Sequence, residues 1–320
     1  MGSRIHQLFP KSVYHLQHID DLKEKTIVFD GSNFLCRYLS AITKDDTPIV
    51  GASGNPISHL IGFSYFVVNS YLYKIRSVFV FDGTENVLKH PLFEKRLEYT
   101  LKWMNTLSIL KKNKYVLYKR ALLESYEYLK LTGLPVISAP SDGESQGSWL
   151  VKTYDFFALS TNDYDGLLFG SPRILVGFNF SKKPIYLLQL NEILDTLSIS
   201  QRQLVEIAIL SGTDYNEGLK NIGPKRAYML IQKYESLEAL LEKKIVSEER
   251  YKTLNVVREY FLSPPVTDVK LYFSAPNYYS IQQFLISHGL SKKRVYTIIS
   301  KLKNGYSKFN SKMETLESYL

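Results

Sequence analysis

The chain has 320 residues, 45% of them hydrophobic, which is enough for one large domain or a core with an appendage. Its single cysteine, Cys36, excludes an internal disulfide and a cysteine-based zinc site. The start, MGSRIHQLFP, lacks the apolar stretch of a signal peptide, and no apolar run of about 18 residues suggests a membrane span, so neither secretion nor membrane insertion is expected.

The formal net charge is +9, and the basic residues are unevenly spread. Segment Thr84–Thr132 has ten Lys and Arg against five Asp and Glu, and Ser291–Lys312 has seven basic residues and no acid. Clustered basic residues favour a polyanionic partner, nucleic acid first. The alternative is that these charges only keep the protein in solution.

Three apolar runs, each with an aspartate at or near its end, read as buried strands separated by helical patterns such as SHLIGFSYFVVNSYLYKI. The runs are Lys25–Asp30, Ser77–Gly83 and Tyr154–Asp163. Strands that alternate with helices predict an α/β fold with a central, mostly parallel sheet flanked by helices. Asp30, Asp82 and Asp163 then share the carboxyl edge of that sheet, where sites form. One such aspartate alone is better explained as the start of a turn.

Segment Thr84–Thr132 interrupts this alternation with basic and aromatic residues and has no glycine. It predicts helices inserted between two core strands, and long insertions in compact domains usually serve function. Its Lys and Arg side chains suit a single nucleic-acid strand and its aromatic rings suit base stacking, although most of the rings are expected to pack within the insertion.

Further carboxylates accompany the strand ends. Asp165 follows Asp163 by two residues, and Asp142 and Glu144 lie in APSDGESQ. Ser141 and Glu144 also match a helix capping box, which is an equally good explanation of that stretch alone. Asp214 closes a helix, where an acid is disfavoured by the helix dipole, so another contact should hold it.

Together these side chains form a set of seven carboxylates that need cations if they converge. The set is Asp30, Asp82, Asp142, Glu144, Asp163, Asp165 and Asp214. Oxygen-only ligands select hard ions, Mg²⁺ or Mn²⁺ rather than zinc. Two such ions about 4 Å apart suit hydrolysis of a phosphodiester.

After these motifs the chain continues with LKNIGPKRAYMLIQKYESLEALLEKK, which predicts helix, tight hairpin and helix, with Pro224 at the start of the second helix. The hairpin presents backbone amides together with Lys225 and Arg226, a combination suited to duplex phosphates. An ordinary helical hairpin is the alternative.

The sequence blocks VFDGSNFL, FVFDG, APSDGESQ, STNDYDGLLFG and LSGTDYNEGLKNIGPKRA follow one another as they do in the flap endonuclease family, the XPG-type structure-specific 5′ nucleases. The chain resembles this family from Gly2 to its last residue. It is most similar to the archaeal members, because no basic nuclear-type tail follows the C-terminal motif; this implies an archaeal cytoplasm, or a nucleus if the source is eukaryotic.

This resemblance implies roles for particular residues. The seven carboxylates match the family's ligands for two Mg²⁺ ions, which Mn²⁺ can replace, and Lys89 and Arg96 match basic residues that contact the scissile phosphate at the foot of a helical arch. The hairpin is implied to be part of a helix-hairpin-helix that also holds K⁺ through backbone oxygens. The residues implied to contact DNA are Gly2, Glu144, Gly212, Asp214, Gly223, Lys225 and Arg226.

The C-terminal segment METLESYL carries Leu316, Tyr319 and Leu320 at i, i+3, i+4 spacing, one face of a helical turn. With Met313 it resembles the box that binds the sliding clamp (PCNA), although Met313 stands where that box has glutamine. A frayed terminal turn is the alternative.

Three other positions depart from the family pattern. Asp142 stands where the family usually has glutamate, Cys36 where it commonly has a tyrosine that stacks on a nucleobase, and Asn221 where the hairpin usually has its first glycine. The shorter side chain makes Asp142 the least secure of the seven ligands, and the stacking contact is in doubt.

The expected regions are a nuclease region 1–102 with the start of the arch, the rest of the arch 103–132, a second nuclease region 133–260 with the helix-hairpin-helix, a C-terminal helical region 261–311 and the clamp-binding tail 312–320. The expected function is a 5′ flap endonuclease with 5′–3′ exonuclease activity in DNA replication, including Okazaki-fragment maturation, and in base-excision repair.

Several rival functions share parts of this pattern. A related 5′ exonuclease or gap endonuclease, or a non-catalytic DNA-junction or clamp-binding subunit, stays open. A haloacid-dehalogenase-type phosphatase is excluded because Ser32 stands where that family needs a second aspartate, and a nucleotide-cofactor enzyme is excluded because no glycine-rich phosphate loop follows the first strand.

Overall fold

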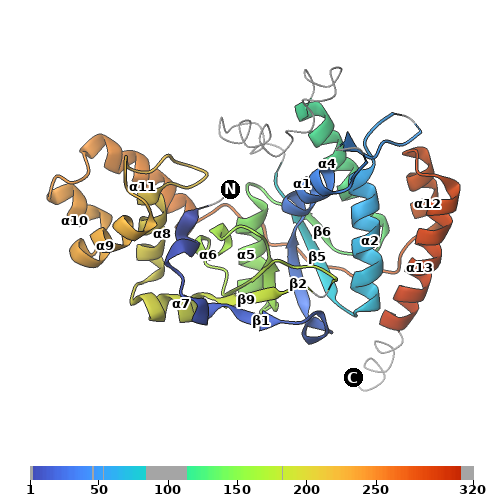
Figure 1. Cartoon of the computed structure of the whole chain (residues 1–320), viewed down its shortest axis with the longest axis horizontal. Helices are drawn as coiled ribbons and strands as arrows, with labels where there is room; N and C mark the ends of the chain where they lie inside the picture. Colours follow the sequence, from blue (N-terminus) through green and yellow to red (C-terminus); the bar gives the residue numbers. More distant parts are fainter. Residues whose placement is uncertain (1–2, 45–46, 53, 84–113, 182, 311–320) are drawn as a thin grey trace.

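The computed structural model describes residues 3–44, 47–52, 54–83, 114–181 and 183–310. At its centre is a seven-stranded sheet in the order β1-β9-β8-β7-β2-β5-β6 (Figure 1). The strands are β1 (His15–Gln17), β2 (Thr26–Asp30), β5 (Arg76–Phe81), β6 (Val136–Ser138), β7 (Ala158–Ser160), β8 (Arg173–Val176) and β9 (Ile185–Gln189). A separate two-stranded ribbon joins β3 (Thr43–Lys44) and β4 (Thr47–Pro48).

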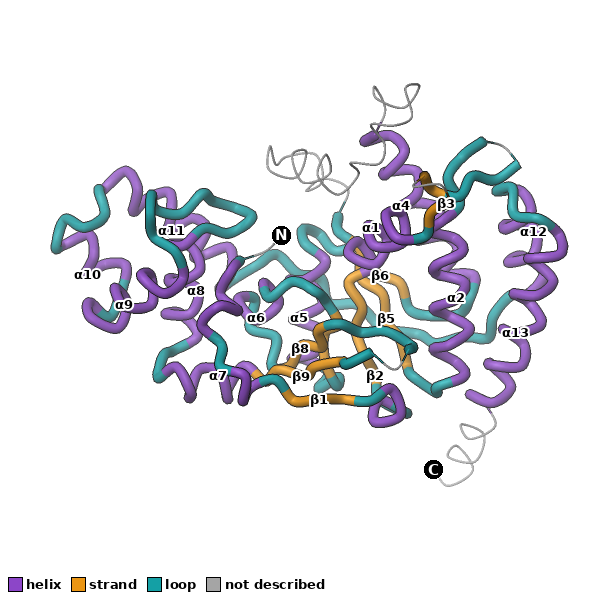
Figure 2. Tube along the Cα trace, viewed as in Figure 1, coloured by secondary structure: helices purple, strands orange, loops and turns teal. Residues whose placement is uncertain are grey.

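Helices cover both faces and both ends of this sheet (Figures 1 and 2). They are α1 (Gly31–Ala41), α2 (Ser58–Leu72), α4 (Lys114–Leu131), α5 (Gly143–Thr153), α6 (Asp165–Leu168), α7 (Leu190–Leu197), α8 (Gln201–Ser211), α9 (Pro224–Tyr234), α10 (Leu237–Glu242), α11 (Glu248–Leu262), α12 (Tyr278–Ser287) and α13 (Lys292–Asn310). Three short 3₁₀ helices, η1 (Arg4–Leu8), η2 (Lys11–Val13) and η3 (Ile19–Leu22), lie near the N-terminus. In the described ranges no helix is both long and apolar enough to cross a bilayer.

The five neighbouring strands β6, β5, β2, β7 and β8 are parallel to one another. At the other edge of the sheet, β9 pairs antiparallel with β8, and β1 pairs antiparallel with β9. The predicted α/β fold with a mostly parallel sheet is therefore confirmed. β2 lies between β5 and β7, with Asp30 opposite Val80 and Phe29 opposite Ser160. The carboxyl ends of these three strands consequently meet at one edge of the sheet.

Alternate residues of the central strands point to opposite faces, which builds two cores. Ile27 and Phe29 contribute to a core with α1, α2, α4, α12 and α13, and Val28 to a core with α5, α6 and the α8–α11 region. The continuous apolar runs of β2 and β5 are explained by burial on both faces. Together the two cores hold the strand ends in fixed positions.

Two local predictions need correction. The expected strand Tyr154–Asp163 is formed only over Ala158–Ser160; Asp163 lies in the following turn, and Asp165 is the first residue of α6. The two aspartates are therefore brought together by a turn and not by strand alternation. The stretch before Gly223 is not helical either: α8 ends at Ser211, and residues 212–223 form turns before α9 begins at Pro224 as predicted.

The inserted segment is described from residue 114 onward, where it is the helix α4. Glu124 attaches α4 to α2, because its carboxylate pairs with the buried His59 ring (Nε2–Oε2 3.0 Å). Arg120 donates to the same carboxylate (2.5 Å). The second half of the insertion is thus fixed to the body of the protein.

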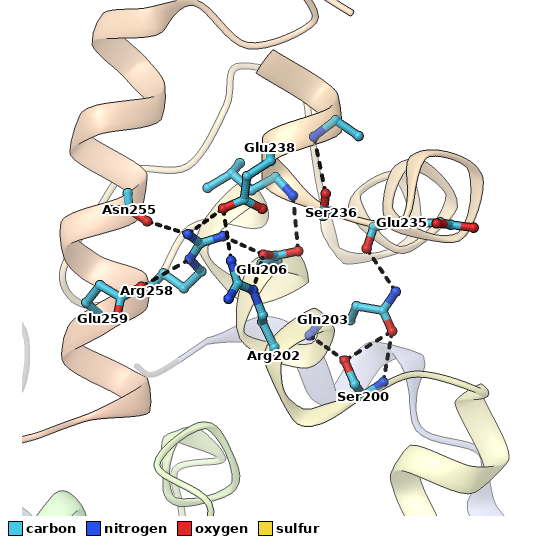
Figure 3. Close-up of polar contacts among 12 residues, drawn as sticks. Ser200, Arg202, Gln203, Glu206, Glu235, Ser236, Glu238, Asn255, Arg258 and Glu259 are labelled. Carbon is cyan, nitrogen blue, oxygen red and sulfur yellow. Dashed lines mark hydrogen bonds and ion pairs between the residues drawn. The ribbon is translucent and has the colours of Figure 1, made fainter. Parts of the chain in front are cut away.

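Helices α8 to α11 form a module at the opposite end from α2 and α13 (Figure 1). Its centre is an ion network around Arg258 of α11, which is 3% exposed (Figure 3). Arg258 donates to Glu206 of α8 (2.7 Å) and to Glu238 of α10 (2.7 Å). Glu206 is fully buried and also accepts from the backbone N–H of Leu237 (3.2 Å). One guanidinium therefore ties three helices together.

We predict that Arg258→Ala destabilises the protein strongly, because the buried Glu206 carboxylate then keeps only the half-exposed Arg202 guanidinium, at 3.3 Å, as a charged partner. The expected loss of unfolding free energy is roughly 3–5 kcal/mol. The matched control on the same helix is Lys252→Ala, which removes an exposed pair with Glu248 and should cost less than about 1 kcal/mol. Urea unfolding followed by circular dichroism measures both, and equal losses for the two variants contradict a structural role of the network.

Candidate metal centre

The carboxyl edge of the sheet gathers the predicted aspartates. Asp30 is the last residue of β2, Asp82 follows β5 directly, and Asp163 lies three residues beyond β7. Asp30 also has the local role that single strand-end aspartates have, because its Oδ1 accepts from the backbone N–H of Asn33 (3.0 Å) and caps α1. The cap and the site are thus not alternatives at this position.

Three carboxylates form the tightest group. Oxygen atoms of Glu144, Asp163 and Asp165 lie within 4.8 Å of one another. Asp165 is only 2% exposed, and one of its oxygens accepts from the backbone N–H of Ser3 (2.8 Å), so the N-terminal segment closes over this side of the group. The two aspartates of the STNDYDGLLFG motif therefore meet a glutamate from a different helix, α5.

Short polar contacts orient the surrounding carboxylates. The Thr161 hydroxyl donates to Glu144 (2.5 Å), and the backbone N–H of Gly143 donates to Asp82 Oδ1 (2.7 Å). A Cβ atom at position 143 would lie 3.2 Å from that oxygen, a tight contact that glycine avoids. The capping-box explanation of Ser141 and Glu144 is wrong, since α5 has no side-chain cap and the Glu144 carboxylate points to Thr161 instead.

Crowding of negative charge perturbs the ionisation of this group. Burial, and next the charge of Asp82, raise the pKa of Asp30 well above its ordinary value. Removal from water, and next the charges of Asp163 and Asp30, raise the pKa of Glu144 in the same way. Within the described part of the chain, no Lys, Arg or His side chain pairs with Asp30, Glu144 or Asp163.

The chemistry of the donors fits a hard divalent cation. The converging groups are carboxylate oxygens, which suit Mg²⁺ and Mn²⁺, and they carry excess negative charge that a cation offsets. Burial, and next the charge of Asp30, raise the pKa of the nearby Cys36 thiol to about 12, so the thiol is protonated when no metal is bound. The carboxylate cluster is therefore consistent with the divalent-metal site of the flap endonuclease family.

Comparisons with known proteins agree with this site. The XPG N-terminal domain matches residues 5–102 and the XPG I-region matches residues 133–214. Flap endonuclease 1 of Staphylothermus marinus is 32% identical over 350 residues, which span 100% of this chain and 99% of the relative. Flap endonuclease 1 of Pyrococcus abyssi is 33% identical over 347 residues, with 100% and 98% covered. The chain belongs to the flap endonuclease family.

Solved structures support the same placement. The flap endonuclease-1 structure from Methanococcus jannaschii superposes with a TM-score of 0.79 at 29% identity and covers 96% of this chain and 99% of that one. The catalytic core of Rad2 in complex with a DNA substrate has a TM-score of 0.71 at 21% identity, covering 94% of this chain and all of that one, and shares the fold. The similarity to flap endonucleases in sequence and in structure thus extends over nearly the whole chain.

Four of the seven expected ligands lie outside the tight group; Asp30 and Asp82 stand at the strand ends beside it, whereas Asp142 and Asp214 lie next to helices. Asp142 is the residue before α5, half-buried, and its Oδ2 accepts from the Ser141 hydroxyl (3.3 Å). Asp214 lies in the turn after α8, half-buried, and not in the helix end as predicted. Gly212 adopts a φ of 98°, and a Cβ atom on Gly218 would lie 2.5 Å from the Gly212 nitrogen, so glycine at both positions closes this turn.

Tyr215, next to Asp214, is a site residue that the sequence did not single out. Burial, and next the charge of Asp142, raise the pKa of its hydroxyl well above the ordinary value, so the group stays a proton donor beside that carboxylate. Thr161 and Ser3 were missed as well. Thr161 stands next to the STNDYDG aspartates and was a detectable candidate; Ser3 acts through its backbone N–H and left no signal.

The hairpin residues stand at the start of α9. Gly223 precedes α9, and Lys225 and Arg226 are exposed in its first turn. Arg226 also donates to the Asn221 carbonyl (2.9 Å). Asn221 itself has a φ of 62°, a conformation that asparagine tolerates better than most residues, which explains how it replaces a glycine here.

Several expected site residues lie outside the described residues. These are Gly2, Lys89, Arg96, Met313, Leu316, Tyr319 and Leu320.

We predict that Asp163→Asn raises the stability of the protein in EDTA, because it removes one of the crowded charges while its side-chain oxygen can still accept from the N–H of Tyr164. The gain should be roughly 1–3 kcal/mol, which raises the melting temperature by a few degrees. Addition of Mg²⁺ should raise the melting temperature of the wild type more than that of Asp163→Asn. Thermal denaturation in EDTA and in Mg²⁺ measures these melting temperatures, and Asp195→Asn on the exposed side of α7 is the control. A melting temperature of Asp163→Asn below that of the wild type in EDTA contradicts repulsion among the carboxylates.

Proposed function

We propose that this protein is a metal-dependent 5′ flap endonuclease with 5′–3′ exonuclease activity that cuts branched DNA where a 5′ flap meets the duplex. The observation that carries the proposal is the carboxylate group of Glu144, Asp163 and Asp165 beside Asp30, in a chain whose whole length is similar to flap endonucleases. Rad2 with a DNA substrate and human GEN1 with Holliday-junction DNA have the same fold, which supports DNA, and branched DNA in particular, as the substrate.

In this proposal the seven carboxylates hold two Mg²⁺ ions, which Mn²⁺ can replace. The ligand set is Asp30, Asp82, Asp142, Glu144, Asp163, Asp165 and Asp214. Two such ions bound together activate a water and stabilise the oxygens that gain charge when a phosphodiester is displaced. The chain's own contribution is to hold the carboxylates in place: Gly143 fixes Asp82, Thr161 fixes Glu144 and the N–H of Ser3 fixes Asp165.

Other residues of the proposed site bind and orient DNA. Lys89 and Arg96 contact the scissile phosphate, and the hairpin from Asn221 to Arg226 grips duplex phosphates and holds K⁺ through backbone oxygens. Basic side chains and backbone amides at a helix start supply sequence-independent phosphate contacts, in keeping with recognition of DNA shape. Gly2, Gly212 and Asp214 complete the DNA-contacting set.

The biological setting proposed is DNA replication and repair, including maturation of Okazaki fragments and base-excision repair. The archaeal sources of the similar flap endonucleases support the cytoplasm of an archaeal cell as the location.

We predict that Asp165→Ala abolishes cleavage of 5′-flap DNA but leaves its binding within about twofold, because the change removes a metal ligand and no duplex contact. Asp30→Ala should behave in the same way, with some added loss of stability because Asp30 also caps α1. Asp195→Ala is the control. Cleavage of labelled flap, gapped and linear DNA with Mg²⁺ or EDTA measures activity, and fluorescence anisotropy measures binding. Near-normal turnover by Asp165→Ala contradicts the metal assignment. If the wild-type protein binds flap DNA but does not cleave it, the non-catalytic alternative is favoured.

The hairpin predicts a change in salt dependence. Lys225→Ala should weaken binding to every duplex-containing substrate alike and reduce the slope of log K against log salt by about 0.9. Adding Arg226→Ala should reduce it further, and also loosen the hairpin because Arg226 bonds the Asn221 carbonyl. Lys243→Ala, an exposed lysine after α10, is the control; an unchanged slope in both hairpin variants argues against a phosphate clamp.

The tail is proposed to bind the sliding clamp through Met313, Leu316, Tyr319 and Leu320. Burial of these apolar side chains in a partner groove should give a complex of micromolar strength, on the order of −8 kcal/mol. Deletion of residues 313–320 should leave cleavage by the isolated protein unchanged and remove its stimulation by the clamp. Equal stimulation of the truncated protein, or loss of basal cleavage, contradicts this proposal.

A further inference from the structure

A chain of hydrogen bonds leads from helix α11 to the carboxylate of Asp142. Tyr260 on α11 and Ser141 before α5 share a hydrogen bond between their hydroxyls, and Ser141 Oγ donates to Asp142 Oδ2 (3.3 Å). Tyr260 and Asp142 are far apart in the sequence, and no motif connects them. We propose that Tyr260 is a positioning residue that aims the Asp142 carboxylate at the bound metal through Ser141; this rests on the proposed function, in which Asp142 is a ligand.

The direction of the hydrogen bonds follows from the number of protons. A serine hydroxyl carries one proton, and the Ser141 proton is used on the carboxylate oxygen. Tyr260 must then donate to Ser141. Each hydroxyl polarises the next, so that the donor facing the ionised carboxylate is stronger than an isolated serine would be.

Tyr260, the first residue of this series of hydrogen bonds, is held rigidly by its neighbours. The Tyr260 ring packs on Tyr215 (centroids 4.9 Å apart) and at its edge on Phe169 (5.8 Å, 81°). Two residues earlier on the same helix, Arg258 ties α11 to α8 and α10. Ser141 is 4% exposed, so water has little access to the shared hydroxyls. A donor whose ring is held by its neighbours can set the direction of the side chain that its hydroxyl contacts.

Asp142 has reason to need such a support. It stands immediately before α5 without capping that helix, and its side chain is one methylene shorter than that of a glutamate. The hydroxyls of Tyr215 and Ser141 both contact its carboxylate. Two hydroxyl donors thus act on the orientation of this short side chain.

The test compares Mn²⁺ binding by DNA-free variants, measured by calorimetry and by the electron paramagnetic resonance signal of free Mn²⁺. Tyr260→Phe removes only the hydroxyl and keeps the ring contacts, and it should weaken one Mn²⁺ site about tenfold while the other is unchanged. Ser141→Ala should weaken the same site, and the double variant should be no weaker than the stronger of the two single effects, because the groups act in series. Tyr251→Phe is the control, since it removes a hydroxyl of the same helix that donates to Glu238, away from Asp142.

Each outcome decides the matter. Tenfold weaker binding in Tyr260→Phe and Ser141→Ala, with an unchanged melting temperature, supports the proposal. If Asp142→Ala weakens Mn²⁺ binding but Tyr260→Phe does not, the inference is overturned and the proposed function stands. If Asp142→Ala has no effect, Asp142 is not a ligand, and the inference falls together with that part of the proposed metal set. Equal weakening of both sites together with a lower melting temperature shows a packing role of Tyr260 and also overturns the inference.

Discussion

Repulsion among carboxylates at one edge of the parallel sheet is the constraint on which the rest of the structure depends. Glu144, Asp163 and Asp165 bring oxygens within 4.8 Å of one another, and Asp30 is buried beside them. Like charges at such separations cost on the order of 3–4 kcal/mol a pair at an effective dielectric constant of about 20. Several pairs therefore rival a typical net stability of about 5–15 kcal/mol, even though raised pKa values relieve part of the repulsion. A divalent cation bound among these carboxylates would relieve their repulsion, which favours its binding.

The fold offsets that cost before any cation is bound. The strands that end at the site are apolar on both sides, and two cores, one on each face of the sheet, hold them in place. The carboxylates are then fixed by contacts that need few side chains: backbone N–H groups of Gly143 and Ser3, and the hydroxyl of Thr161. The same rigid frame extends through the Arg258 network into the hairpin module, so that the metal site and the proposed duplex-binding surface belong to one packed structure.

The central strands, their terminal aspartates and the start of α9 were predictable from the sequence, because each depends on residues that are close together in the chain. Apolar runs that end in Asp30 and Asp82, separated by helical patterns, specify parallel strands whose carboxyl ends share an edge. Pro224 marks the start of α9 for an equally local reason. Boundaries were less predictable: FFALSTND continues to look like a strand beyond Ser160, whereas the turn that places Asp163 and the start of α6 at Asp165 are set by packing.

The missing site residues share one property, which is that their role comes from tertiary contacts. Ser3 acts through its backbone, and Tyr215 and Tyr260 read as ordinary aromatic residues of a turn and a helix. Glu144 fitted a capping box as well as a site, and only its contact with Thr161 decides between them. Residue type and spacing identify most of the carboxylates, but not the donors that orient them.

The most direct test of the central claim is anomalous diffraction from crystals of the full chain soaked in Mn²⁺, recorded at the manganese absorption edge. The account predicts two anomalous peaks about 4 Å apart at the carboxyl edge of the sheet, bound by the carboxylates of Asp30, Glu144, Asp163 and Asp165 and their neighbours. A carboxylate group without any peak, in crystals of protein that cleaves flap DNA with Mn²⁺ in solution, would contradict it.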